Sequence, residues 1–185
     1  MEQKINGTFV KIVVKGIKSD KAHQEEYDKL LSEEAKNFLK QRVLNSVWYS
    51  WDLFSELIKA LIKVAAKDDK KIVKKWGADF GEGVIFVIYK NIIDEGNVKK
   101  LAEIYPRFHG LMYNFGTLSV DTISDNEILF TYRNFNPGFE LFYDALVGWT
   151  QWTLEMCIKK KTSCEFLKKF WEGDEVTQFR LTWAP

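Results

Sequence analysis

Apolar residues recur at three- and four-residue steps through most of residues 1–115, and this spacing is typical of amphipathic helices. The steps predict helices over about 20–39 and 50–66, and a third that begins at about residue 68. Ser50 is placed to act as the N-cap of the second helix. The first part of the chain is therefore expected to be a helical layer.

Two further stretches of this part are strongly apolar. Residues 7–17 fit both elements, because their β-branched content favours a strand and their apolar spacing favours a helix. Residues 84–93 are apolar nearly all round and predict a buried helix, too short to span a membrane. A helix is expected over 97–113, with a kink at Pro106.

From Gly116 the pattern changes to strict alternation, which predicts a hairpin with its turn at Asp125 and Asn126. A long helix over 138–161 follows, and then two more strands joined at 172–174. This order predicts an α+β fold in which a helical layer packs on an antiparallel sheet of about four strands. We expect one domain over 1–185, with a helical part over about 1–115 and a hairpin–helix–hairpin part over about 116–185.

Composition narrows the class of protein. The apolar fraction of 46% is enough for a core, and a net charge of +1 provides no field that would attract nucleic acid. The two cysteines, Cys157 and Cys164, fit neither a disulfide framework nor a zinc site. Without a signal-peptide pattern or a membrane span, we expect a cytoplasmic protein with reduced thiols.

No catalytic constellation is visible. The sequence contains two histidines, neither beside a nucleophile motif, and its paired carboxylates are adjacent in sequence and so do not face each other on a helix. The glycines Gly77, Gly81 and Gly83 lack the order of a dinucleotide fingerprint and indicate close helix packing instead. We therefore expect a protein that is not an enzyme and holds no metal.

Aromatic side chains are the clearest candidates for a binding site. The long helix has a predicted inward stripe of Phe139, Phe142, Ala145, Leu146, Trp149, Trp152 and Met156. A ligand pocket lined by aromatic residues is one interpretation and an ordinary core is the other. The candidate pocket residues are Trp48, Trp51, Trp76, Tyr132, Phe142, Trp149 and Trp152.

Several local phrases, in order over nearly the whole chain, resemble a family first described as multiple paralogues in myxobacteria. The matching phrases are Gly7-Thr8-Phe9-Val10, Arg42-Val43-Leu44 with Val47-Trp48-Tyr49-Ser50, Trp76-Gly77-Ala78-Asp79-Phe80-Gly81, Tyr105-Pro106-Arg107 with Tyr113-Asn114-Phe115-Gly116, Gly148-Trp149, and Gly173-Asp174 with Trp183. That family is similar in turn to the fold of haem nitric-oxide-binding domains, vinyl-reductase-like domains and Golgi tethering subunits. The resemblance implies a ligand-binding fold.

Two departures from these relatives limit what the resemblance implies. Phe170 and Thr177 stand where vinyl-reductase-like members often have cysteines, which argues against a thiol metal site. The haem domains carry a Tyr-x-Ser-x-Arg triplet that holds the haem carboxylates. In residues 132–136 of this chain only Tyr132 matches it.

His109 carries the haem alternative. The resemblance places it roughly where the haem domains have their proximal ligand, and a neutral imidazole is a haem iron ligand. The myxobacterial relatives have an aromatic residue at this place, so the other interpretation is a core histidine. His23 lies in a charged segment and is expected to be solvated.

Three functions follow from these observations. The first is a non-enzymatic sensor or adaptor that binds an apolar small molecule or a protein partner, without a cofactor. The second is a haem-based gas sensor that uses His109. The third is an oligomerising scaffold, such as a homodimer, without a small ligand.

Overall fold

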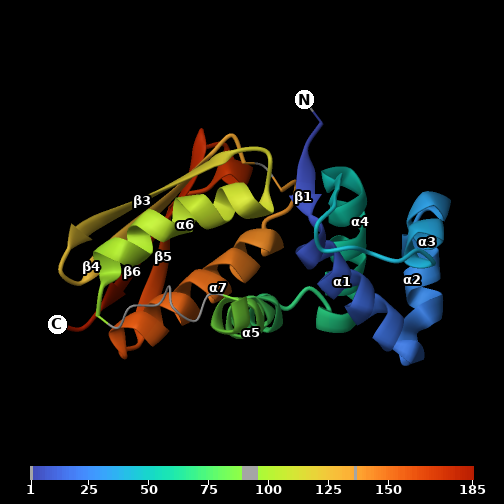
Figure 1. Cartoon of the computed structure of the whole chain (residues 1–185), viewed down its shortest axis with the longest axis horizontal. Coiled ribbons are helices and arrows are strands. Elements are labelled where there is room, and N and C mark those ends of the chain that lie inside the picture. The colour runs from blue at the N-terminus through green and yellow to red at the C-terminus, as the bar shows by residue number, and fades with distance from the viewer. Residues whose placement is uncertain (1, 89–95, 136) are drawn as a thin grey trace. The chain divides into compact units, whose positions relative to one another are not determined.

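The computed structural model describes residues 2–88, 96–135 and 137–185, and of residues 84–88 it describes the backbone alone. The chain divides into two compact units (Figure 1). Unit 1 consists of Met1–Asp69 and Leu111–Phe115, and unit 2 of Lys70–Gly110 and Gly116–Pro185. A single domain over 1–185 stays a prediction.

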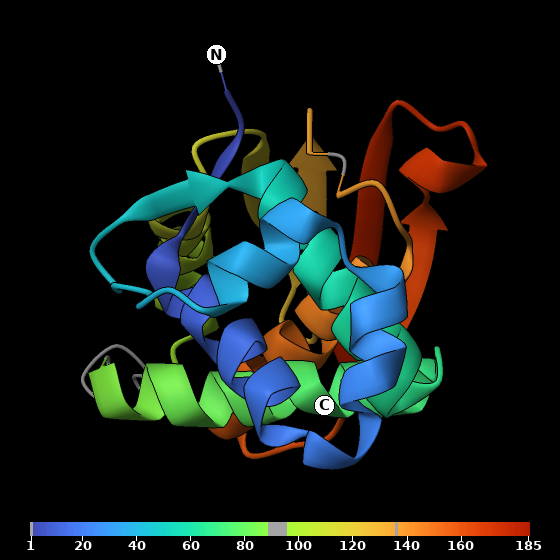
Figure 2. The same ribbon diagram turned by 90° about the vertical axis from the view of Figure 1, so that its right-hand side faces the viewer.

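Unit 1 is mainly helical. In chain order its elements are β1 (Lys4–Asn6), α1 (Gly7–Ser19), the 3-10 helix η1 (Lys21–His23), α2 (Gln24–Leu30), α3 (Glu33–Leu39), β2 (Trp48–Ser50), α4 (Trp51–Leu61) and the π-helix η2 (Ile62–Ala66). The strands β1 and β2 pair antiparallel, and α1 packs on α4 (Figure 2). The predicted helix over 50–66 is confirmed, although its last turn is the π-helix.

The stretch over residues 7–17, which sequence periodicity leaves undecided, is the helix α1. The side chain of Asn6 accepts a hydrogen bond from the amide of Thr8 at 2.9 Å and so caps the helix. A side chain at Gly7 would collide with the backbone oxygen of Leu44. The chain therefore enters α1 at a position that needs glycine.

The prediction of one helix over about 20–39 is wrong, because the chain breaks between α2 and α3. Ser32 caps α3 by accepting a hydrogen bond from the amide of Ala35 at 3.2 Å. The carboxylate of Glu56 on α4 accepts hydrogen bonds from both the amide and the hydroxyl of Ser32. These side-chain bonds replace the backbone bonds of a continuous helix.

Unit 2 contains the sheet. Its elements are α5 (Lys70–Ile88), α6 (Val98–Met112, whose last two residues belong to unit 1), β3 (Thr117–Ser124), β4 (Glu127–Arg133), α7 (Leu141–Ile158), β5 (Thr162–Lys168), the 3-10 helix η3 (Phe170–Glu172) and β6 (Val176–Trp183). The four strands are antiparallel in the order β3-β4-β6-β5. The predicted α+β class and the hairpin–helix–hairpin part are confirmed.

The two central strands carry the core of the sheet. Phe130 on β4 lies opposite Phe179 on β6, and their rings stack with centroids 4.9 Å apart. Ile128 and Leu181 form the neighbouring pair, and all four side chains are fully buried. Their alternation with more exposed residues is the pattern of a sheet that is covered on one face.

Residues 84–88 are helical, as the prediction of a helix over 84–93 requires, but they are the end of α5, which runs without a break from Lys70 through three glycines to Ile88. Residues 89–93 lie outside the described residues. A side chain at Gly77 would collide with the backbone oxygen of Ala145 on α7, and one at Gly148 would collide with that of Lys74 on α5. The predicted close helix packing at Gly77 is confirmed by this reciprocal contact.

The long helix α7 is buried on more faces than the single inward stripe that its sequence predicts. Phe142, Leu146 and Trp149 are buried as expected, but Tyr143, Thr150, Thr153, Leu154 and Cys157 are buried as well. The reason is that α7 packs against α5 and also against β5, so several of its faces are enclosed. No helix among the described residues is long and apolar enough to cross a membrane.

Candidate functional site

His109 lies on α6 with only 4% of its surface exposed. The side chain of Asn97 begins this helix by accepting a hydrogen bond from the amide of Lys100 at 3.0 Å. The imidazole ring lies 5.0 Å from the ring of Phe135 and 5.8 Å from that of Tyr132, both edge-on. His109 is thus an enclosed imidazole beside an aromatic wall.

Local backbone geometry brings Phe135 to this place. Asn134, just after β4, has a φ of 50°, a left-handed conformation that asparagine tolerates. A Cβ at Gly116 would lie 2.6 Å from that of Phe135, so glycine makes room there. The Tyr143 hydroxyl donates to the backbone oxygen of Phe135 at 2.7 Å, and burial raises the pKa of Tyr143 to about 12.

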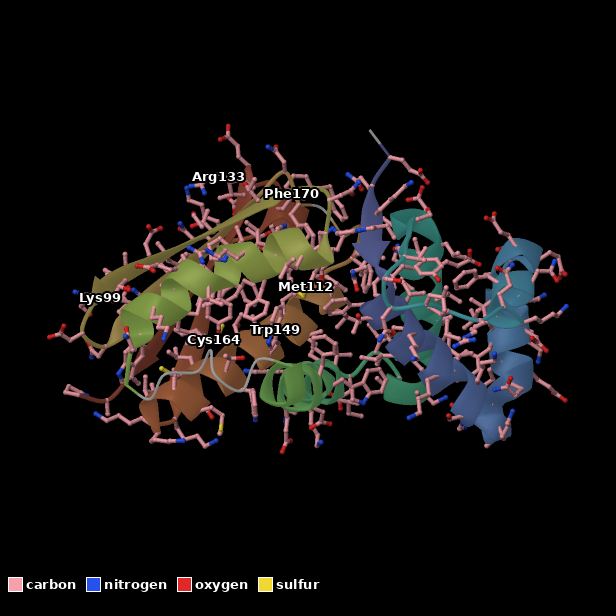
Figure 3. The ribbon with its side chains drawn as sticks, in the orientation of Figure 1. Lys99, Met112, Arg133, Trp149, Cys164 and Phe170 are labelled. Atoms are coloured by element: carbon pink, nitrogen blue, oxygen red, sulfur yellow. The ribbon has the colours of Figure 1, made fainter. Side chains whose placement is uncertain are left out.

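A second aromatic cluster surrounds Trp149, which is 5% exposed. The rings of Phe80, Tyr105 and Phe108 lie edge-on to it at 6.0, 6.3 and 6.2 Å. Figure 3 shows Trp149 on the side of α7 that faces α6. The buried indole nitrogen of Trp149 has no hydrogen-bond partner within the described part of the chain. A buried donor of this kind needs an explanation, because its loss of hydration is not compensated.

The seven candidate pocket residues divide between the two units. Trp48 and Trp51 belong to unit 1, where Trp48 is 39% exposed and Trp51 packs on Phe54, Tyr113 and Phe115. In unit 2 a Cβ at Gly81 would lie 2.8 Å from Trp149 and 3.0 Å from Trp152.

The other three candidates also lie in unit 2. Tyr132 and Phe142 both pack on Phe135, at 5.5 and 6.3 Å, and Trp76 is half-buried on α5. That these residues line a pocket stays a prediction. Sequence reasoning did not identify Phe135 as a neighbour of His109. The spacing of Tyr105, Phe108 and His109 does place these three residues on one face of α6.

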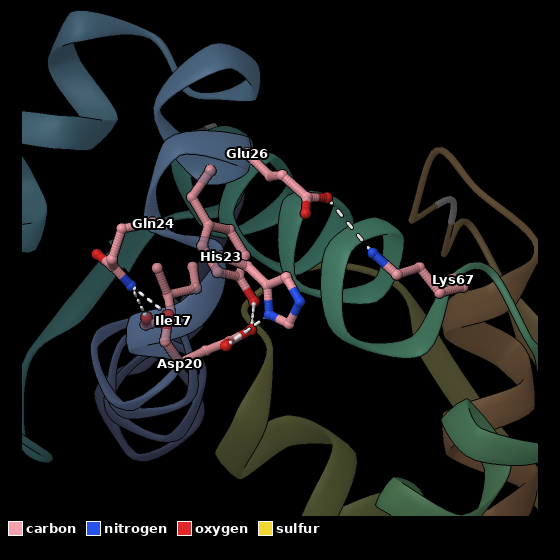
Figure 4. Close-up of polar contacts among 7 residues, drawn as sticks. Ile17, Asp20, His23, Gln24, Glu26 and Lys67 are labelled. Carbon is pink, nitrogen blue, oxygen red and sulfur yellow. Dashed lines mark hydrogen bonds and ion pairs between the residues drawn. The ribbon is translucent and has the colours of Figure 1, made fainter.

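His23 is solvent-accessible, as its charged segment predicts, with 40% of its side chain exposed, and it is also paired. Its Nδ1 lies 2.7 Å from the Oδ1 of Asp20, and the Tyr27 hydroxyl donates to Oδ2 at 2.9 Å (Figure 4). The hydrogen bond with His23 lowers the pKa of Asp20. The neighbourhood of His23 is therefore polar and anionic, unlike that of His109.

The residues provide a candidate axial ligand for a haem iron but do not match the triplet that holds the haem carboxylates. His109 provides a buried imidazole nitrogen against aromatic rings, which suits an axial ligand of iron. The triplet that holds the haem carboxylates is not matched, since Asn134 stands at its second place and Asn136 lies outside the described residues. The neighbouring Arg133 is exposed, and its Nη1 donates to the Ser119 hydroxyl on β3 at 2.8 Å.

The described residues, 2–88, 96–135 and 137–185, contain no cluster of side chains that could bind a metal ion. No group of three or more His, Cys, Asp or Glu side chains there is placed to hold an ion. Burial raises the pKa of the Cys164 thiol to about 11, so this thiol is protonated and a poor ligand at neutral pH.

Known structures resemble this one over almost the whole chain. An H-NOX protein from K. algicida, in an Fe(II) unliganded crystal structure, has a TM-score of 0.69 and 15% identity over 98% of this chain and 97% of that chain. A variant H-NOX from T. Tengcongensis has a TM-score of 0.66 and 13% identity over 98% of both chains.

An oxygen-binding H-NOX domain related to soluble guanylate cyclases has a TM-score of 0.65 and 11% identity, over 98% of this chain and 96% of that chain. No protein-family model and no curated protein matches the sequence. Identities this low show the fold alone. The chain has the H-NOX fold, which is the haem nitric-oxide-binding fold that the sequence resemblance implies.

Proposed function

We propose that this chain is a non-enzymatic sensor domain, and that His109 is the residue that holds the iron of a haem. The single observation that carries the proposal is the buried imidazole of His109 on α6, in a chain with the H-NOX fold. When bound, a haem supplies an iron centre that takes a diatomic gas, as the oxygen-binding relative does. This reading is favoured over a sensor for an apolar molecule without a cofactor.

The residues around His109 have their own part in this proposal. Tyr132 and Phe135 hold the imidazole edge-on and keep water from its ring. Phe135 is itself fixed through its backbone oxygen by Tyr143. Because asparagine replaces the triplet's arginine at position 136 as well as its serine at 134, the haem carboxylates would lack that charged partner, and we expect weak retention of haem during purification.

Haem reconstitution tests the proposal. The purified protein is mixed with haemin under reducing conditions, passed through a desalting column and scanned for a Soret band. We expect a Soret band of less than one haem per chain, equal in wild type and in His23→Phe, and no band in His109→Phe. The two variants are matched, because they place the same side chain at the two histidines of the chain.

Circular dichroism of each variant confirms that it is folded. If wild type acquires no Soret band, or if His109→Phe retains one equal to that of His23→Phe, His109 is not a haem ligand.

A second candidate function is a sensor for an apolar small molecule that carries a hydrogen-bond acceptor. The specific observation behind it is the indole nitrogen of Trp149, which lies among aromatic rings of α5 and α6 and has no hydrogen-bond partner in the described residues. Native mass spectrometry of protein purified from cells tests it. A small molecule that co-purifies with wild type and is lost from Trp149→Phe supports this candidate, and a bare chain in both preparations rejects it.

A further inference from the structure

The strand β3 forms one edge of the four-stranded sheet and pairs with β4 along one side alone. On its other side, alternate residues present unpaired amide and carbonyl groups, which are a template for another strand. No backbone hydrogen bond to that side of β3 is found among the described residues. The strand also lacks the lysines and prolines that usually protect such an edge, and Asp121 is its one charge.

At the opposite edge of the sheet, side chains form hydrogen bonds with the backbone of the edge strand β5. At the start of β5 the amide of Thr162 donates to the carboxylate of Glu155 at 2.9 Å. The side-chain amide of Gln151 donates to the carbonyl oxygen of Thr162 at 3.0 Å. Two side chains of α7 thus occupy the first backbone groups of β5, and nothing comparable covers β3 in the described residues.

The strand β3 lies beside α6 (Figure 1), and a groove of about 520 Å³ is lined by residues of both elements. Its wall on the strand side is five consecutive residues, 118–122. Consecutive side chains of a strand point to opposite faces, so this edge of the backbone itself lines the groove. On the helix side, Ala102 and Pro106 lie one turn apart on the same face of α6. We call this feature the β3–α6 groove.

Charge and polarity along the β3–α6 groove are uneven. Leu118 and Val120 of β3, with Ala102 and Pro106 of α6, make its apolar surface. Glu103 on α6 and Asp121 on β3 are exposed lining residues, and neither has an ion pair among the residues described.

Lys99 is the one cation among the lining residues, and it lies at the first turn of α6 (Figure 3). Two unpaired carboxylates against one amine leave the groove complementary to a basic ligand.

We propose that the β3–α6 groove binds an extended peptide segment of a protein partner, which adds a fifth strand to β3 and places a lysine or arginine near Glu103 or, on the other face of the sheet, near Asp121. The unpaired backbone edge would supply the affinity through main-chain hydrogen bonds. The apolar surface takes alternate side chains of the peptide, and the two carboxylates select its charge. His109 is not among the lining residues, so peptide binding can be measured both with and without haem.

The test uses a fluorescent seven-residue peptide in which valine alternates with threonine and one central lysine. Anisotropy titration of the full chain is expected to give saturable binding, and hydrogen exchange should show added protection of amides in β3. The same peptide with alternate amides N-methylated is expected to lose binding, because it cannot pair with a strand edge.

A double variant, Glu103→Lys with Asp121→Lys, tests the charge preference. We expect the lysine peptide to bind it about tenfold more weakly and a matched glutamate peptide to bind it more tightly. The control is Glu82→Lys with Glu175→Lys, two exposed carboxylates of unit 2 that do not line the groove, and it should bind as wild type does.

Three results would overturn the proposal. The first is no saturable binding of the lysine peptide to wild type. The second is equal binding of the N-methylated peptide, since that would exclude strand addition. The third is a concentration-dependent dimer in sedimentation whose formation protects β3, because the occupant of the edge would then be a second copy of this chain.

Discussion

The α5–α7 crossing in unit 2 and the corner between α1 and α2 in unit 1 are held by different kinds of contact. At the crossing Gly77 and Gly148 let each helix touch the backbone of the other, and aromatic rings close around it. At the corner the side-chain amide of Gln24 donates to the carbonyl oxygens of Ile17 and Asp20 at 2.8 and 2.7 Å. Close packing therefore stabilises the α5–α7 crossing, whereas hydrogen bonds and charge stabilise the corner between α1 and α2.

The difference has a physical consequence for each region. Close-packed helices cannot accept added atoms, and their contacts do not depend on pH. Polar contacts at a surface corner accept small changes of volume, but they depend on the ionisation of groups such as Asp20. Substitutions that add atoms, remove atoms or change charge should therefore affect the two regions unequally.

The largest effect is expected from removing the ring at the centre of the crossing. Trp149→Ala should lower the free energy of unfolding by about 3–5 kcal/mol, because it leaves a large cavity among Phe80, Tyr105 and Phe108. Trp149→Phe should lower it by only about 1–2 kcal/mol, since the indole nitrogen loses no partner among the described residues. Urea denaturation of both variants measures the difference. Equal losses would mean that the indole nitrogen is bonded in solution.

Adding one methyl group at the crossing should be nearly as damaging. Gly148→Ala is expected to destabilise by about 3 kcal/mol, because its Cβ would meet the backbone oxygen of Lys74 and the helices must separate. The control is Gly83→Ala in α5, where no atom of the described residues lies within 4 Å of the added atom. It should stabilise by about 0.5–1 kcal/mol through helix propensity. A melt in which Gly148→Ala equals wild type would contradict the close contact.

The same substitution in unit 1 should be mild. A Cβ at Gly16 in α1 would lie 3.2 Å from a methyl carbon of Leu61, the end of a flexible side chain. We expect Gly16→Ala to change the free energy of unfolding by less than about 1 kcal/mol, since Leu61 can shift and alanine favours the helix. Thermal melts of Gly16→Ala and Gly148→Ala side by side test the contrast, and similar losses would remove it.

The smallest effect concerns the charge at the corner. The pKa of Asp20 is lowered below its ordinary value of 3.8, so its ionised form is favoured by folding. Its contribution is therefore present above that value and is lost as pH falls through the lowered pKa. Asp20→Asn should melt at a lower temperature than wild type at pH 6, and the gap should close toward pH 2. A gap that persists at pH 2 would show that the carboxylate charge is not the cause.

Periodicity predicted most of the elements, and the errors have local causes. The helices over 50–66 and 97–113 and both hairpins follow from spacing and turn residues alone. The break at Ser32 was missed because apolar spacing continues across it, and it depends on Glu56, a residue distant in sequence. The continuity of α5 was missed because glycines that usually weaken a helix are required here by the approach of α7.

The candidate site was harder to predict than the fold. His109 was identified through the resemblance to haem domains, and the structure adds that its imidazole is buried beside Tyr132 and Phe135. Phe135 was not identified, because its position depends on the left-handed conformation of Asn134 and on the space at Gly116. The periodicity of apolar residues does not predict the backbone conformation of a single residue such as Asn134.

The burial of α7 on several faces makes its amides a measure of the stability of unit 2. Because residues on several of its faces are buried, amides in the middle of α7 have no local route to water. Their exchange with deuterium should occur only when unit 2 unfolds as a whole. The slowest exchanging amides of α7 would then report the global stability of unit 2 in native buffer, without any denaturant.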